Sequence, residues 1–208
     1  IDVIIPRGGK SLVQKVLDLS SVPTIGHLEG LCHIYLDKKF DYSMANKIII
    51  NSKLRRTSIC GAAETLLIHR SINEGIIFKL LNNLHLQGCK IIGDRYTKKI
   101  FKNSFIAKEI DWRTEYLDSK ISVKLVKDVD EAVNHIKKYG TSHTECRISK
   151  NKQNIDKFTK RIQSSIIMQN ASTQFADGYE FGLGSEVGIS TNRMRPRGPV
   201  GLEQLVTY

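Results

Sequence analysis

The stretch "LRRTSICGAAETLLIH" places one cysteine, Cys60, between two arginines and a turn of small residues, directly before an apolar run. A thiolate at this position could attack an acyl carbon, because the small residues that follow leave room for an acyl group. Arg55 and Arg56 would favour the thiolate through their charge, or else form a solvated basic patch. Free cysteines are more often buried and inert, so both interpretations of Cys60 stay open.

Two further short stretches carry groups suited to chemistry. Residues 7–10, "RGGK", look like a phosphate loop but lack the spacing of the dinucleotide fingerprint or of the Walker motif. The alternative is that Arg7 and Lys10 are simply solvated. In "HLEG", His27 and Glu29 offer an imidazole and a carboxylate for proton transfer, or are ordinary loop residues.

The elements that would position these groups alternate between strand-like and helix-like segments. "IDVII" reads as a buried strand, followed by a Gly-rich turn, an amphipathic helix and the strand-like "VPTI". The later strand-like runs are "LCHIYLD", "ETLLIH", "SKISVKLVKD" and "IIMQN". A helix is expected over about 43–53 with Ser43 as its cap, and others are closed by Gly88 and Gly140. This alternation predicts an α/β fold, a parallel-type sheet flanked by helices.

Composition and charge narrow the class of protein. The 208 residues are 40% hydrophobic and 25% charged, as in soluble globular proteins. The net charge of +11 indicates acidic partners, whether phosphorylated metabolites, nucleic acid or anionic membrane. Four cysteines without a C-x-x-C pair argue against a disulfide framework or a thiolate zinc site, so we expect no metal and a reducing, cytoplasmic compartment. No membrane span or signal peptide is recognised, and no membrane partner is expected.

Six segments in order show a resemblance to a known family. They are "IIPRGGKSLV", "HLEGLCHIYLD", "CGAAETLLIH", "DWRTEYLD", "NASTQFADGYEFGLGSEVGIST" and "RGPVGLEQLVTY". Together they resemble gamma-glutamyl phosphate reductase, the proline-biosynthesis member of the aldehyde dehydrogenase superfamily. The resemblance runs from residue 1 to residue 208.

The resemblance implies how the chain is organised. Family chains are about twice as long, so this chain corresponds to the C-terminal half and is expected to need a separate N-terminal half. Residues 1–26 would be the last βα unit of the Rossmann-like cofactor domain, 27–190 the catalytic domain, and 191–208 a C-terminal hairpin used to form a homo-oligomer. The strand-like start without Met also suggests a fragment, whose exposed apolar edge would invite association.

The resemblance also implies a reaction. Cys60 would attack the acyl phosphate carbon of L-glutamyl 5-phosphate and release phosphate, and NADP(H) would then reduce the thioester to L-glutamate 5-semialdehyde. His27 stands where aldehyde-oxidising members of the superfamily have a water-activating glutamate. Its presence fits an enzyme that must protect its thioester from hydrolysis.

Binding residues follow from the same resemblance. Glu115 matches the glutamate that holds the nicotinamide ribose, although a surface or helix-cap acid is the alternative. Arg7 and Gly8 match the cofactor-side turn, and the substrate's amino-acid end would meet Asn170, Ser172 and Thr173, with Arg55 and Arg56 nearby. At positions 26, 61 and 174 the chain has Gly, Gly and Gln where the family usually has Lys, Asn and Arg, and each change removes a polar or cationic group.

Two other classes of function remain. A degenerate, noncatalytic remnant could persist as an interaction protein, and such a chain would lack a Cys60 thiol of low pKa that outreacts Cys32, Cys89 and Cys146. A basic nucleic-acid-binding protein is suggested by the charge alone. It lacks a recognition helix, zinc spacing and stacking aromatics, so no nucleic-acid partner is expected.

Overall fold

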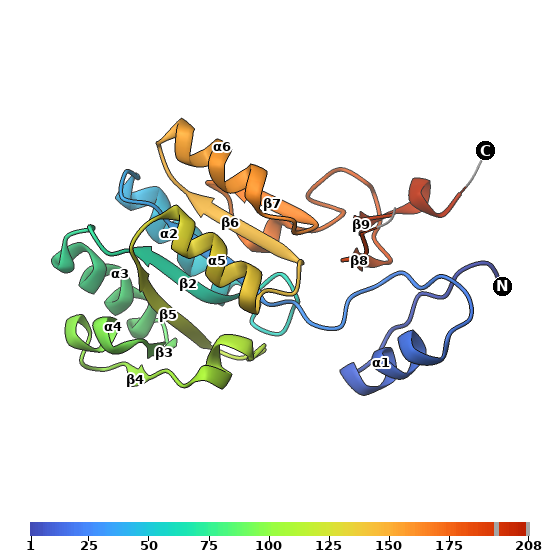
Figure 1. Cartoon of the computed structure of the whole chain (residues 1–208), viewed down its shortest axis with the longest axis horizontal. Helices are drawn as coiled ribbons and strands as arrows, with labels where there is room; N and C mark the ends of the chain where they lie inside the picture. The colour runs from blue at the N-terminus through green and yellow to red at the C-terminus, as the bar shows by residue number, and fades with distance from the viewer. Residues whose placement is uncertain (194–195, 207–208) are drawn as a thin grey trace.

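A seven-stranded parallel sheet forms the centre of the larger body in this computed structural model, which describes residues 1–193 and 196–206 (Figure 1). The strand order is β4-β3-β5-β2-β1-β6-β7, and every pair in it is parallel. The strands are β1 (Cys32–Leu36), β2 (Ala63–His69), β3 (Lys90–Gly93), β4 (Phe105–Ile106), β5 (Lys120–Val126), β6 (Thr144–Ile148) and β7 (Ile166–Gln169). The α/β fold with a parallel sheet is therefore confirmed.

Helices cover both faces of this sheet (Figure 1). One face carries α2 (Tyr42–Leu54), α3 (Glu74–Leu86) and α4 (Arg95–Ile100), and the other carries α5 (Val129–Tyr139) and α6 (Lys152–Arg161). Short 3₁₀ turns are η1 (Glu109–Arg113), η2 (Thr173–Phe175) and η3 (Leu202–Leu205). No described helix is long and apolar enough to cross a bilayer.

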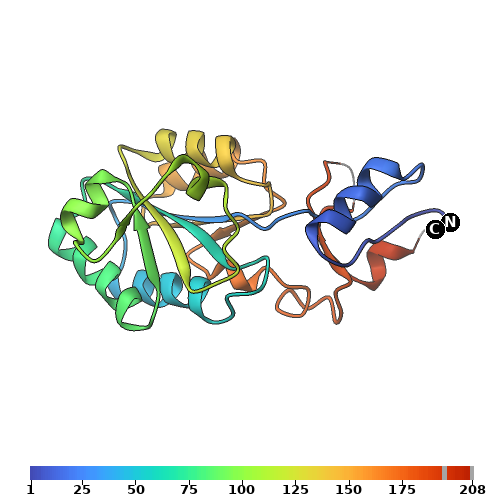
Figure 2. The ribbon, with the colours of Figure 1, turned by 90° about the horizontal axis from the view of Figure 1, so that it is seen from below.

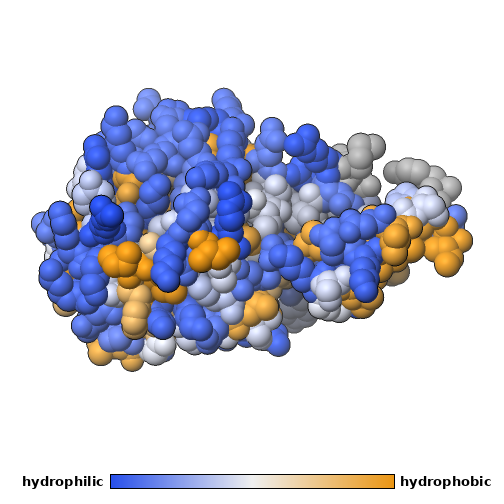
Figure 3. All heavy atoms as spheres, turned by 60° about the horizontal axis from the view of Figure 1, so that its bottom comes forward, coloured by the Kyte–Doolittle hydropathy of each residue, from blue (hydrophilic) through white to orange (hydrophobic). Residues whose placement is uncertain are grey.

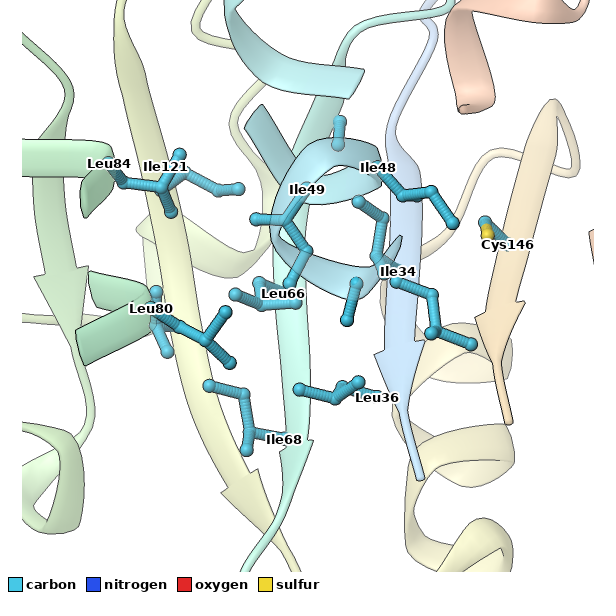
Figure 4. Close-up of a cluster of buried hydrophobic side chains, with 14 of the residues drawn as sticks. Ile34, Leu36, Ile48, Ile49, Leu66, Ile68, Leu80, Leu84, Ile121 and Cys146 are labelled. Atoms are coloured by element: carbon cyan, nitrogen blue, oxygen red, sulfur yellow. The ribbon is translucent and has the colours of Figure 1, made fainter. Parts of the chain in front are cut away.

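The core follows from alternation along the central strands. Ile34 and Leu36 of β1 pack toward α2 and α3, whereas Tyr35 between them packs toward α5 and α6. Figure 4 shows this layer, with Leu66 and Ile68 of β2 beside the β1 side chains. Each such side chain, fully removed from water, contributes about 1.5–3 kcal/mol, so the sheet is a rigid base for the loops at its ends.

A smaller lobe, residues 1–26, 188–193 and 196–206, lies beside this body (Figure 2). It contains α1 (Lys10–Leu19) and an antiparallel hairpin of β8 (Gly188–Ser190) and β9 (Gly198–Val200). The N-terminal and C-terminal segments meet here, and Asn192 Nδ2 donates to the Thr24 carbonyl at 2.6 Å. Apolar atoms gather on the surface of this lobe (Figure 3).

The lobe differs from two expectations. "IDVII" is not a buried strand: it makes one parallel bridge, between Ile4 and Thr24, and residues 1–3 are exposed. Among the described residues, no further strand pairs with this segment on either side. The expected hairpin of residues 191–208 begins earlier, because β8 pairs with β9, and positions 194–195 and 207–208 lie outside the described residues.

Helix boundaries are close to those expected. The cap of α2 is Asp41 rather than Ser43, because the Asp41 carboxylate accepts from the Met44 amide. Gly88 closes α3 with φ +85°, a conformation that glycine adopts without strain. The short segments β3, β4 and α4 were not recognised, because "CKIIGDRYTKKIFKNSFI" has no clear period.

Candidate active site

A cavity of about 500 Å³ lies where the small lobe meets the body. Residues 5–10 and 188–189 line it from the lobe, and Cys60 and Glu115 line it from the body. His27 lines it from the segment that connects the two. We call this space the Cys60 cavity. It brings together five of the residues expected at the site, namely Cys60, His27, Glu115, Arg7 and Gly8.

All the body residues of this site stand at the amino ends of neighbouring strands. Cys60 precedes β2, Glu115 precedes β5, and Gly30 precedes β1. His143 directly precedes β6. Since these four strands are adjacent and parallel, their amino ends form one edge of the sheet, and the loops before them converge there.

A buried ion pair holds the loop that carries Cys60. Lys53, at the end of α2, donates from Nζ to Glu64 Oε2 at 2.7 Å, and both side chains are buried. The other oxygen of Glu64 accepts from the Leu117 amide at 3.4 Å. One carboxylate therefore closes the base of the Cys60 loop and tethers the segment that presents Glu115.

Gly30 is a site residue that the sequence reasoning missed. Its amide donates to Glu115 Oε1 at 2.8 Å. A Cβ at this position would lie 2.2 Å from the Cys60 carbonyl oxygen, so only glycine lets the two backbones approach this closely. The signal was the glycine in "HLEG", which stands between two candidate residues and the strand.

The electrostatics of the thiol differ from expectation. Burial, together with the charges of Glu115 and Glu186, raises the pKa of Cys60 to about 11, although the charge of Arg7 acts in the opposite direction. Arg55 and Arg56 do not line the cavity: Arg55 pairs with Glu180 at 3.2 Å, and Arg56 is exposed. The cation that acts on the thiol is Arg7, and the thiol is protonated at neutral pH.

His27 is oriented by the lobe. Its Nδ1 lies 2.7 Å from the Ile189 carbonyl oxygen, which can only accept, so Nδ1 carries the proton. Its ring meets that of His143 edge to face, with centroids 4.7 Å apart. Burial and the neighbouring His27 lower the pKa of His143 to about 3, so the His143 ring is neutral.

Glu115 is partly buried beside the thiol. Burial raises its pKa, as does the charge of Glu29, whereas the hydrogen bond from Gly30 lowers it. Lys10 lines the cavity, and its Nζ lies 2.6 Å from Glu29 Oε1. A carboxylate and two cations, Arg7 and Lys10, thus face the same cavity.

The expected substrate loop lies outside the Cys60 cavity. Asn170 Oδ1 accepts from the Ser149 amide at 2.9 Å, and Ser172 Oγ accepts from Ser52 Oγ at 3.2 Å. Thr173 is fully buried, and its amide donates to Ser52 Oγ. The structure therefore gives these three residues contacts within the fold, and their binding role stays a prediction.

Two of the departures from the family pattern touch each other. A Cβ on Gly61 would lie 3.2 Å from the Thr173 carbonyl oxygen and 3.5 Å from the Gln174 Cα. Gln174 itself donates from Nε2 to the Ser52 carbonyl at 2.9 Å. Since positions 61 and 174 are in contact, a side chain at one constrains the other. The third departure, Gly26, lines the Cys60 cavity.

Comparisons with known proteins agree with the resemblance. The chain is 49% identical over all its 208 residues to a gamma-glutamyl phosphate reductase from Parvibaculum lavamentivorans, covering 49% of that protein. It is 50% identical to one from Methylocella silvestris, covering 48% of it. The chain thus spans about half the length of the curated relatives it matches. No protein-family model matches the chain.

Solved structures give the same picture. The crystal structure of gamma-glutamyl phosphate reductase from Thermotoga maritima superposes with a TM-score of 0.97 and 43% identity, over 100% of this chain and 50% of that one. An acetylating aldehyde dehydrogenase from Geobacillus thermoglucosidasius superposes with a TM-score of 0.70 over 92% of this chain and 51% of that one, at 19% identity, and shares the fold. The resemblance stated from the six segments is therefore confirmed.

Proposed function

We propose that this chain carries the acyl-transfer centre of a gamma-glutamyl phosphate reductase, which releases phosphate from L-glutamyl 5-phosphate and forms L-glutamate 5-semialdehyde. The observation that carries the proposal is that Cys60, His27, Glu115 and Arg7 all face one cavity. The similarity of the whole chain to half of such reductases supports the same reaction.

The first step uses groups of this chain alone. The sulfur of Cys60 forms a bond to the acyl carbon, and the bond from that carbon to the phosphate oxygen breaks, so phosphate leaves with the electron pair. The thiol proton passes to Nε2 of His27, whose Nδ1 proton is held by Ile189. Arg7 and Lys10 supply positive charge in the cavity for the departing anion.

Residues of the same cavity fit a nicotinamide cofactor. One oxygen of Glu115 accepts from Gly30, which leaves the other oxygen to accept from a ribose hydroxyl. Arg7 offers a cation for a phosphate of NADP(H), and Gly8 would let the backbone approach it. When bound, NADPH supplies the two-electron reduction of the thioester.

The wider assignments belong to the same proposal. Asn170, Ser172 and Thr173, with Arg55 and Arg56, would recognise the substrate's amino-acid end, and a shift of the loop that holds them would be needed. Residues 1–26 would complete a cofactor domain, 27–190 would act as the catalytic domain, and 191–208 would mediate a homo-oligomer. The supporting observation is that both ends of the chain contribute to one lobe.

The proposal is tested in the reverse direction. NADP⁺ reduction by glutamate 5-semialdehyde is measured with phosphate present, for this chain alone and with the N-terminal half of a relative added. We expect activity with the added half, its loss in Cys60→Ala, and its retention in Cys89→Ala, a buried cysteine outside the cavity. Absence of activity while the halves associate, with a full-length reductase active in the same assay, contradicts the proposal.

A second candidate is a noncatalytic interaction protein. The raised pKa of Cys60 favours it, because a protonated thiol is a weak nucleophile. The same assay separates the two candidates, since the interaction protein binds the added half without turnover.

A further inference from the structure

We propose that Cys60, His27 and His143 form a binding site for a divalent cation of the zinc class. One ligand atom from each, the Cys60 sulfur and a ring nitrogen from each histidine, lies within 4.8 Å of the other two. Two imidazoles and one thiolate are a donor set that zinc prefers, and three protein ligands leave its fourth position open. We call these three residues the His-Cys-His cluster.

His143 supplies the first independent argument. Its side chain is 0% exposed, yet Nε2 has no hydrogen-bond partner within the described part of the chain. A buried nitrogen left without a partner loses its hydrogen bond to water and gains none in return, so such an atom calls for an explanation. A cation shared with Cys60 and His27 would satisfy it.

The hydrogen bonds around His143 show which nitrogen can bind a metal. Cys32 Sγ donates to the Cys60 carbonyl oxygen at 3.0 Å, so the single thiol proton of Cys32 is already used. The same sulfur lies 3.5 Å from His143 Nδ1 and can then only accept from it. Thr144 Oγ1, at 2.9 Å from Nδ1, is a hydroxyl oxygen that can accept from it as well. The proton therefore sits on Nδ1, and Nε2 presents a lone pair.

His27 has the matching arrangement. Its Nδ1 proton is held by the Ile189 carbonyl, so its Nε2 also presents a lone pair. Metal-binding histidines almost always donate their other ring proton to an oxygen of the protein, which fixes the tautomer and the ring orientation. In this cluster both histidines already make that outer contact.

The geometry needs only a small contraction. Ligands of tetrahedral zinc, at about 2.0–2.3 Å from the metal, lie about 3.5 Å from one another. The ligand atoms of the cluster lie within 4.8 Å of one another, so the widest pair must close by up to about 1.3 Å on binding. His27 can supply this movement together with the lobe segment that holds its Nδ1, because His27 is partly exposed at the cavity whereas His143 is fully buried. The negative charges of Glu115 and Glu186, which act on the sulfur, favour a dication there.

Occupation of the cluster would have a consequence for the reaction, and this consequence rests on the proposed function. A sulfur bound to the cation cannot attack an acyl carbon, so the ion and the acyl substrate would exclude each other. The cation would act as a reversible inhibitor that also shields the thiol from oxidation.

Metal binding is tested directly with Co²⁺, which replaces zinc and gives a thiolate-to-metal charge-transfer band. We expect the chain to show this band at one equivalent under anaerobic conditions. Cys60→Ser should abolish the band, and His27→Gln and His143→Gln should each weaken binding at least tenfold. Cys89→Ser and His85→Gln, which change residues outside the cluster, should leave the titration unchanged. A missing band in the unaltered chain, or a band that survives Cys60→Ser, overturns the proposal.

A second measurement does not depend on variants that could fail to fold. Saturating Zn²⁺ should slow alkylation of Cys60 by iodoacetamide, read by mass spectrometry, and a chelator should restore the rate. An unchanged rate at saturating Zn²⁺ overturns the proposal. Neither readout involves turnover, so absence of reductase activity would leave the metal site standing, and absence of metal binding would leave the reductase proposal standing.

Discussion

Burial has the largest effect on the pKa of the Cys60 thiol, and two carboxylates and one guanidinium add to it, because charges interact strongly where water is excluded. Glu115 and Glu186 oppose the thiolate and Arg7 supports it. Arg55 and Arg56 are close to Cys60 in the sequence, but both are exposed and neither lines the cavity. Proximity along the chain is thus a poor guide to which charge acts on the thiol.

This balance predicts a pH dependence of thiol reactivity. The pKa of Cys60 is raised from 9.0 to about 11, so its alkylation by iodoacetamide should increase up to about pH 11. Glu115→Gln removes a negative charge and should speed alkylation at pH 8, whereas Arg7→Gln should slow it, by about tenfold for each unit of pKa shift. Mass spectrometry of Cys60 after timed alkylation gives the rates. A midpoint below pH 9, or a slower Glu115→Gln, contradicts this assignment of charges.

The contact between Gly30 and Cys60 predicts a stability difference between two glycines. Gly30→Ala forces a Cβ against the Cys60 backbone and should cost about 1–3 kcal/mol of the free energy of unfolding. Gly9→Ala is the control, because nothing lies within 4 Å of a Cβ there and the change should stay within about 0.5 kcal/mol. Urea unfolding of both variants measures the difference. Equal stability of the two variants would show that the backbones are not in contact.

At the scale of elements, the amino ends of four parallel strands gather the site. Ligands of open α/β sheets more often bind at the carboxyl ends of strands. Here the loops before β5, β2, β1 and β6 present Glu115, Cys60, Gly30 and His143. The opposite end of the sheet carries a buried polar cluster around Asp37, which connects β1 to β6 and α6.

Asp37 predicts an acid-dependent part of the stability. Burial alone would raise its pKa, but hydrogen bonds from Asn154, Ser149 and the Lys38 amide lower it. A lowered pKa stabilises the fold at pH values above the ordinary value near 4, and this stabilisation is lost as the pH falls through the folded pKa. Asp37→Asn should cost about 2–4 kcal/mol at pH 7, because it also leaves Arg147 buried with a weaker partner.

Urea unfolding of both chains from pH 3 to pH 7 measures this effect. The difference in the free energy of unfolding between the chain and Asp37→Asn should shrink toward pH 3. A difference that stays constant over this range would show that the pKa of Asp37 in the folded chain is not lowered.

At the scale of the whole molecule, the small lobe exposes apolar surface (Figure 3). Leu19 is 83% exposed and Leu202 69% exposed, and both lie on this lobe. Such side chains invite contact with another chain, either a second copy or an N-terminal half. The lobe therefore gives a physical reason for the expected association.

Self-association should depend on these lobe residues. Sedimentation of the chain should show a concentration-dependent oligomer, and the double variant Leu19→Lys with Leu202→Lys should shift it toward the monomer. Leu86→Lys is the control, because Leu86 is 74% exposed but lies on the body. An equal effect of the control and the lobe variant would rule out the lobe as the contact surface.

The local sequence pattern was enough to predict the α/β fold and the principal strands. Strand alternation, helix periodicity and the glycines that end helices each depend on a few neighbouring residues. It was also enough to single out Cys60, His27, Glu115, Arg7 and Gly8 through the family resemblance, and the structure places all five at one cavity. The prediction of a buried strand over "IDVII" was wrong, since an apolar run indicates burial but does not show that a neighbouring strand is present.

Only the tertiary structure decided which groups meet. Cys60 and His143 are 83 positions apart, so no spacing motif could indicate that their ligand atoms lie together with His27. The order of the strands, β5-β2-β1-β6, is what makes those loops neighbours. The raised pKa of Cys60 has the same origin, because burial and the charges of Glu115 and Glu186 exist only once the chain is folded.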